Sequence, residues 1–254
     1  MGVASLFRGL RDEVEKASGW RIRAEFPFGN EKYRDLRRVL PQLDIRTVLD
    51  VGANTGQSAV QYRKEFPDAV MHCFEPVGST ADQLRKYIHH PSVHIHQLAL
   101  GACPGMLTMQ ISLDEQQSGM NSLKGIHPHL EGSNFRSEQV EVTTLDEWCP
   151  KNGIGQVDLL KIDTEGFDLE VLHGASGLLD QGRIGLIDVE MGINPTNTFH
   201  APFTEISPFL WSKGMLFFGI YDQLQELPTT GPILRRVNGL FISSQLALPA
   251  ATKP

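Results

Sequence analysis

The feature that most constrains this chain is an apolar strand that runs directly into a glycine-bearing turn. The segment Val48-Leu49-Asp50-Val51-Gly52-Ala53-Asn54-Thr55-Gly56 is followed by a helical pattern. In an open parallel sheet, ligands bind beyond the carboxyl ends of the strands, where such a turn lies. Gly52 would let a ligand approach the backbone closely, and Gly56 would let the next helix begin against the strand. The segment therefore predicts a doubly wound α/β fold with a ligand site at this turn.

The residues of the turn also distinguish between cofactors. The dinucleotide pattern G-x-G-x-x-G fails, because Asn54 stands where its second glycine would be. A pyrophosphate needs a bare backbone at that point, whereas S-adenosylmethionine has no pyrophosphate and carries a sulfonium and an ammonium. Asp50, an acid at the end of the first strand, suits those cations. The turn thus favours S-adenosylmethionine over a nicotinamide dinucleotide.

From residue 47 onward, short apolar runs alternate with helical stretches. The runs are dense in Val, Ile, Leu and Phe, which is typical of strands buried on both faces. The expected strands are 47–51, 69–74, 93–98, 157–162, 184–189, 215–220 and 239–242, and the expected helices are about 56–65, 79–88, 168–179 and 202–213. This alternation predicts a mostly parallel, seven-stranded, Rossmann-like sheet with helices on both faces. The last two strands can pair antiparallel at one edge.

The domain organisation follows from this pattern. The 254 residues suit one large domain, expected at 47–254, after an N-terminal helical segment at 1–46. That segment either packs on the sheet or forms a homodimer contact. Residues 101–146 interrupt the alternation with strand-like runs at 106–111 and 139–143. The polar stretch 114–138 between them is expected to be a lid over the acceptor side.

Composition excludes several classes of protein. With 41% hydrophobic and 21% charged residues, the chain resembles an ordinary globular protein. A formal charge of −7 disfavours nucleic acid as a partner. Three cysteines without a C-x-x-C pair suggest neither a disulfide framework nor a zinc knuckle, and no apolar run is long enough to span a bilayer. We therefore expect a soluble, cytoplasmic protein without a transmembrane segment.

Acidic residues follow three further strands of the expected sheet. Glu75, before Pro76, can accept both ribose hydroxyls of a nucleoside. Asp163 and Glu165 leave the strand at 157–162, and Glu190 leaves the next one. Acids gathered around one crevice are what a sulfonium donor, a divalent metal or a general base would each require.

Together these motifs resemble the FkbM-type methyltransferase family. Its members share the V-L-D-V-G-A-N-x-G turn, an E-P after the second strand and the K-I-D-x-E-G pattern that 161–166 matches. The resemblance covers roughly residues 47–191 and takes in the segments 119–123 and 142–148. It implies a class I methyltransferase fold with S-adenosylmethionine as donor. It also implies O-methylation of a hydroxyl on a sugar, glycolipid or polyketide-like small molecule.

The resemblance and the turn residues define a candidate site. The expected donor-site residues are Asp50, Gly52, Ala53, Asn54, Gly56, Glu75, Pro76, Ala99, Leu100, Ser122 and Asp163. Asp163 is the first candidate for the general base that takes the acceptor's proton, with Glu165 and Glu190 behind it. Alternatively, Asp163 and Glu190 hold a divalent cation such as Mg²⁺ that binds a vicinal diol.

Other interpretations stay open at this level. Asp50 can cap the following helix, Glu75 can be a solvent-facing strand end, and Glu165 can be an acid favoured by a helix N-terminus. A histidine of the 114–138 stretch can serve as the base. Two rival functions are a non-catalytic module that binds S-adenosylmethionine or a nucleotide, and a nicotinamide-dependent oxidoreductase.

Overall fold

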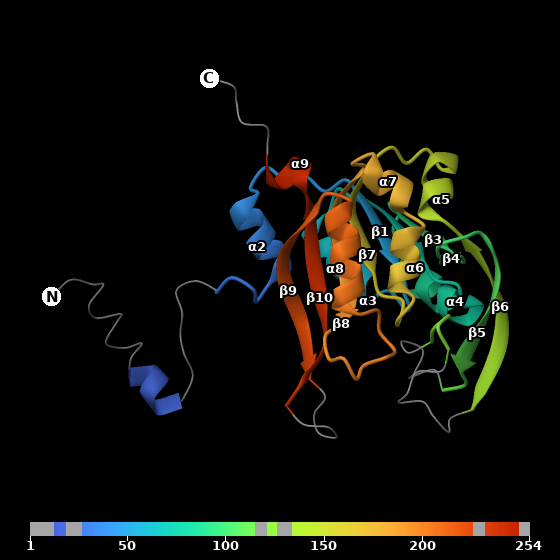
Figure 1. Ribbon diagram of the computed structural model, residues 1–254, viewed down its shortest axis with the longest axis horizontal. Coiled ribbons are helices and arrows are strands. Elements are labelled where there is room, and N and C mark those ends of the chain that lie inside the picture. The colour runs from blue at the N-terminus through green and yellow to red at the C-terminus, as the bar shows by residue number, and fades with distance from the viewer. Residues whose placement is uncertain (1–12, 19–26, 115–120, 126–133, 226–231, 249–254) are drawn as a thin grey trace.

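The central sheet has seven strands in the order β3-β2-β1-β7-β8-β10-β9 (Figure 1). The computed structural model describes residues 13–18, 27–114, 121–125, 134–225 and 232–248. The strands of this sheet are β1 (Thr47–Val51), β2 (Val70–Phe74), β3 (Val93–His96), β7 (Val157–Ile162), β8 (Ile184–Gly192), β9 (Met215–Gln225) and β10 (Leu234–Ser243). All neighbours pair in parallel except β10, which is antiparallel to both β8 and β9. The predicted mostly parallel, seven-stranded α/β sheet is confirmed.

The order of the strands fixes where a crevice opens. From β1 the chain continues outward through β2 and β3, whereas β7 and β8 lie on the other side of β1. The carboxyl ends of β1 and β7 therefore form the switch point of the sheet, which is where ligands bind in such folds.

Helices cover both faces of the sheet because successive strand residues point to opposite sides. On one face, Leu49 and Leu160 pack against α5 to α8, and on the other, Val48 and Leu159 pack against α2 and α3. The helices are α2 (Lys32–Val39), α3 (Gln57–Glu65), α4 (Gly78–Tyr87), α5 (Leu145–Lys151), α6 (Asp168–His173), α7 (Ser176–Asp180), α8 (Phe203–Ser212) and α9 (Ser244–Ala247).

The expected single helix over 168–179 is two helices, α6 and α7. The carboxylate of Asp146, on α5, accepts hydrogen bonds from the backbone N–H groups of Gly177 and Leu178 at 2.7 and 2.8 Å. This side chain provides α7 with an N-terminal cap of its own, so a new helix begins there.

A second, three-stranded sheet contains the two strand-like runs of the interrupting region. It has the order β4-β6-β5, formed by β4 (Ala99–Leu100), β5 (Gly105–Ser112) and β6 (Phe135–Thr143). Most of the stretch expected to form a lid, namely 115–120 and 126–133, lies outside the described residues.

The N-terminal part contributes α2 to the core. Tyr33 and Leu36 are buried against Val48 of β1, and Lys32 pairs with Asp188 of β8. A helix is also present at 13–18, whereas 1–12 and 19–26 of the expected N-terminal helical segment lie outside the described residues. Across the described part of the chain, no helix has the length and apolar character needed to cross a membrane.

Candidate active site

A cavity that is open to solvent lies at the carboxyl ends of β1, β2 and β7. Seven of the expected donor-site residues form part of its wall, namely Gly52, Asn54, Glu75, Pro76, Ala99, Leu100 and Asp163. The rest of the wall is Val51, Phe74, Leu98, Met109, Asn121, Leu123, Thr164, Glu165 and Phe167. Four expected residues, Asp50, Ala53, Gly56 and Ser122, do not contribute to the wall.

Gly52 allows the two central strands to meet at the cavity floor. Its φ angle is +81°, and a Cβ atom here would overlap the backbone carbonyl of Asp163. The close approach expected at this glycine is therefore made by the chain itself, where the turn after β1 contacts the end of β7. Any larger residue would push these two walls apart.

Glu75 is a buried carboxylate in the cavity wall, 7% exposed. Its two oxygens accept hydrogen bonds from the backbone N–H groups of Asn54 and Val77, each at 3.0 Å. Burial raises the pKa of Glu75 to about 7, although these N–H groups oppose the shift. Further hydrogen-bond donors from a ligand would favour its ionised form.

Asp50 lies below the cavity in a row of charged side chains across the sheet. Asp50 is in register with Lys161 of β7, which is in register with Asp188 of β8. Burial raises the pKa of Asp50 to about 6, while the Lys161 charge lowers it. Asp50 therefore belongs to the charged row beneath the cavity and does not line the cavity itself.

Asp163 differs from Glu75 in its charge state. The Lys161 ammonium donates a hydrogen bond to its carboxylate at 2.8 Å. Burial would raise the pKa of Asp163, but Lys161, with Arg236 and His200, lowers it below its ordinary value. Asp163 is thus kept ionised and is a weak base.

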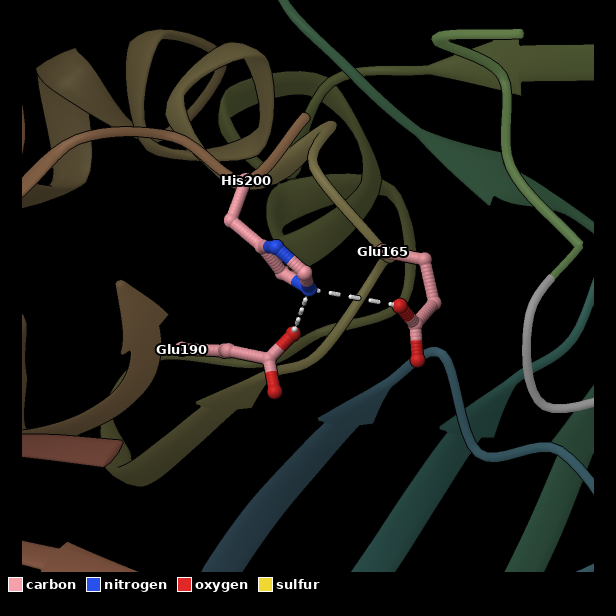
Figure 2. Close-up of side chains that lie close together, drawn as sticks. All are labelled: Glu165, Glu190 and His200. Atoms are coloured by element: carbon pink, nitrogen blue, oxygen red, sulfur yellow. Dashed lines mark ion pairs between the residues drawn. The ribbon is translucent and has the colours of Figure 1, made fainter. Parts of the chain in front are cut away.

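Glu165, Glu190 and His200 meet beside the cavity (Figure 2). His200 Nε2 lies 3.5 Å from an oxygen of Glu165 and 3.3 Å from an oxygen of Glu190. The side chains of Glu190 and His200 are fully buried, whereas Glu165 also lines the cavity. We call these three residues the Glu-Glu-His cluster.

The turn after β7 aims Glu165 at this cluster. Glu165 has a φ of +52°, and Gly166 follows with a φ of +97°. The buried Asp168 accepts hydrogen bonds from the N–H groups of Thr164 and Gly166, each at 3.0 Å. Ser122 donates a hydrogen bond to the Glu165 carbonyl at 2.7 Å. Ser122 therefore positions the turn from outside the cavity.

Sequence reasoning missed His200 and the residues that hold it. His200 lies between β8 and α8, in a segment without a recognisable motif. Its Nδ1 lies 3.1 Å from Oδ1 of Asn197, and Arg236 of β10 pairs with Glu190. Only the pairing of β10 with β8 brings this arginine to the site, because Arg236 is 46 positions after Glu190 and in register with Gly192.

Comparison with known proteins decides the family. The family model described as the methyltransferase FkbM domain matches residues 50–217. The chain belongs to the FkbM methyltransferase family. The resemblance expected from the motifs is confirmed, and the match agrees with S-adenosylmethionine as the expected methyl donor.

Two proteins of known description are similar to part of this chain. The chain is 28% identical over 167 residues to Methyltransferase 1 of Beauveria bassiana, an alignment that covers 59% of this chain and 65% of that protein. It is 25% identical over 147 residues to 2-O-methyltransferase NoeI of Sinorhizobium fredii, covering 54% of this chain and 60% of that one. The chain therefore spans less than two thirds of the length of either relative.

Among solved structures, a precorrin-6y C5,15-methyltransferase from Geobacter metallireducens aligns over 88% of this chain and 94% of its own. Its TM-score is 0.44 and its sequence identity is 11%.

Proposed function

We propose that this protein transfers a methyl group from S-adenosylmethionine to a hydroxyl of a sugar, glycolipid or polyketide-like small molecule. The observation that carries this proposal is the cavity, whose wall has the buried Glu75 on one side and Asp163 and Glu165 on the other. The chain belongs to a methyltransferase family. The choice of a hydroxyl acceptor is supported by the relative NoeI, which is described as a 2-O-methyltransferase.

The residues of the cavity fit the donor. Glu75 is buried with only two backbone donors, so ribose hydroxyls would supply the hydrogen bonds that favour its charge. Asp163 is ionised and suits a neighbouring cation. When bound, S-adenosylmethionine supplies a methyl group already activated by its sulfonium.

The protein's own contribution is mainly to position the reactants. Glu75 would fix the ribose, and the apolar wall of Leu98, Leu100 and Phe167 would exclude water. Asp163 is poorly suited to take a proton because Lys161 stabilises its charge. Glu165 is the member of the Glu-Glu-His cluster that reaches the cavity, so we assign it the contact with the acceptor hydroxyl and its proton.

The first test is isothermal titration of the purified protein with S-adenosylhomocysteine, with NAD(H) as the comparison. We expect selective binding of S-adenosylhomocysteine, weakened at least tenfold in Glu75→Ala, since that change removes the ribose contact. Binding of NAD(H) alone, or of neither ligand, would overturn the proposal. Turnover with a panel of hydroxylated sugars and glycolipids then separates an enzyme from a module that only binds the donor.

A further inference from the structure

We infer that Glu165, Glu190 and His200 hold a divalent transition-metal ion whose remaining coordination positions face the acceptor. The inference that an ion binds here rests on the geometry and burial of the cluster. Its role toward an acceptor hydroxyl rests on the proposed function.

The spacing of the three side chains is that of ligands around one ion. One potential ligand atom from each residue lies within 4.8 Å of the others, and His200 Nε2 is 3.5 and 3.3 Å from the two glutamate oxygens. A charge-assisted N–H···O bond is shorter, about 2.7–2.9 Å. Ligands about 2.0–2.2 Å from a tetrahedral ion lie about 3.4 Å apart. The two distances from His200 Nε2 match the second arrangement.

Asn197 holds the ring of His200 in place. The N–H groups of Phe199 and His200 point at Asn197 Oδ1, each at 3.3 Å, and Asn197 Nδ2 donates to the Arg235 carbonyl at 3.3 Å. His200 Nδ1 lies 3.0 Å from Nδ2 and 3.1 Å from Oδ1 of Asn197, so Nε2 is the ring nitrogen that faces the two carboxylates. A partner of this kind orients the imidazole of a metal ligand.

The charge of the buried groups also calls for a cation. Glu190 is fully buried, and Arg236 pairs with its Oε1, which leaves Oε2 directed at His200. Glu190 Oε2 has no hydrogen-bond partner among the described residues, and buried charges are stable only when they are paired or bind a metal. A cation at the cluster would supply that partner.

The donor set indicates the class of ion. Imidazole nitrogen favours zinc and other transition ions, whereas Mg²⁺ and Ca²⁺ prefer oxygen ligands throughout. Three protein ligands leave positions open, as in catalytic zinc sites. Glu165 lines the cavity, so these positions face the space where the acceptor would lie. There the ion would lower the pKa of a hydroxyl, so that the Glu165 oxygen that does not bind the ion can take its proton.

The experiment titrates metal-stripped, full-length protein with Zn²⁺, Mn²⁺ and Mg²⁺, and records the absorption spectrum of the Co²⁺ form. We expect one site that prefers Zn²⁺ or Mn²⁺ to Mg²⁺, with at least tenfold weaker binding in His200→Gln. The matched control, His173→Gln, changes an exposed histidine on α6 and should bind like the wild type. Asn197→Ala should lower metal affinity about 10–100-fold, as loss of such an orienting partner does.

Each variant is compared by circular dichroism and by its affinity for S-adenosylhomocysteine, which His200 does not contact because it is not in the cavity wall. Equal metal affinity in the wild type and in both His200→Gln and Asn197→Ala would overturn the inference, as would no binding at all. Metal binding without S-adenosylhomocysteine binding would support the cluster while overturning the proposed donor. The converse result would leave the donor proposal standing and reject the metal.

Discussion

Two carboxylates in one cavity wall have opposite charge preferences because only one of them has a lysine. Asp163 accepts a hydrogen bond from Lys161, and its pKa lies below the ordinary value. Burial raises the pKa of Glu75 to about 7, against two backbone N–H groups. Near neutral pH, the charge of Asp163 is therefore fixed, whereas Glu75 can still release a proton.

The pH dependence of donor binding tests the role of Glu75. Ribose hydroxyls donate to a carboxylate more strongly than to the neutral acid, so binding should release a proton. We expect the affinity for S-adenosylhomocysteine to rise between pH 6 and 8, by at most about tenfold per pH unit. Titration in buffers of different ionisation enthalpy measures the released proton. Glu75→Gln should bind more weakly and lose this dependence; an unchanged dependence would assign the proton to another group.

At the scale of elements, the turn between β7 and α6 joins the donor cavity to the Glu-Glu-His cluster. A Cβ atom on Gly166 would overlap the carbonyl of Phe199, the residue that precedes His200. The glycine thus lets the turn that carries Glu165 lie against the segment that carries His200.

Substitution of Gly166 should move the turn that carries Glu165 away from the segment that carries His200. Gly166→Ala adds strain at a φ of +97° and also displaces the segment at Phe199. Gly153→Ala is the matched control, because its φ is +72° and its Cβ would meet open space. We expect Gly153→Ala to cost about 1–2 kcal/mol in unfolding free energy, and Gly166→Ala to cost more and to lower metal affinity. Equal costs in urea titrations would show that the contact with Phe199 is unimportant.

The sequence predicted most of the sheet and seven of the residues that line the cavity. Six of the seven strands begin within one residue of the expected position, because runs buried on both faces are rich in β-branched and apolar residues. The outer halves of β9 and β10 were missed, since residues such as Asp222 and Arg236 give no apolar signal. His200 was missed for a related reason. Its position depends on a tertiary contact at Gly166 and on Asn197, and neither appears as a spacing in the sequence.

At the scale of the molecule, a buried ion pair fastens α2 to the centre of the sheet. The Lys32 ammonium lies 2.6 Å from Asp188 and 2.9 Å from Asp222. Lys32 and Asp188 are buried, whereas the side chain of Asp222 is 60% exposed. Asp188 is also in register with Lys161, so the helix and the floor of the active site share one charged network.

Removal of the lysine should destabilise the whole fold. Lys32→Ala leaves Asp188 buried without this partner, and a broken buried pair costs about 3–5 kcal/mol in unfolding free energy. Asp222→Asn, at the exposed end of the same network, should cost less than about 1 kcal/mol. Chemical denaturation measures both values. A similar small cost for the two variants would mean that α2 is held by its apolar contacts alone.

The position of β10 has a consequence for the order in which the protein is completed during synthesis. β9 pairs with β10 alone in the sheet, and β10 pairs with β8, which was made more than forty residues earlier. While a ribosome is still adding residues 234–243, β9 has no neighbour and Glu190 lacks Arg236. The strands β1, β2, β3, β7 and β8 can already assemble at that stage, since domains fold from the N-terminus as they emerge. The cavity wall formed by β1, β2 and β7 can thus assemble on the nascent chain, whereas the Glu-Glu-His cluster gains Arg236 only when β10 enters the sheet.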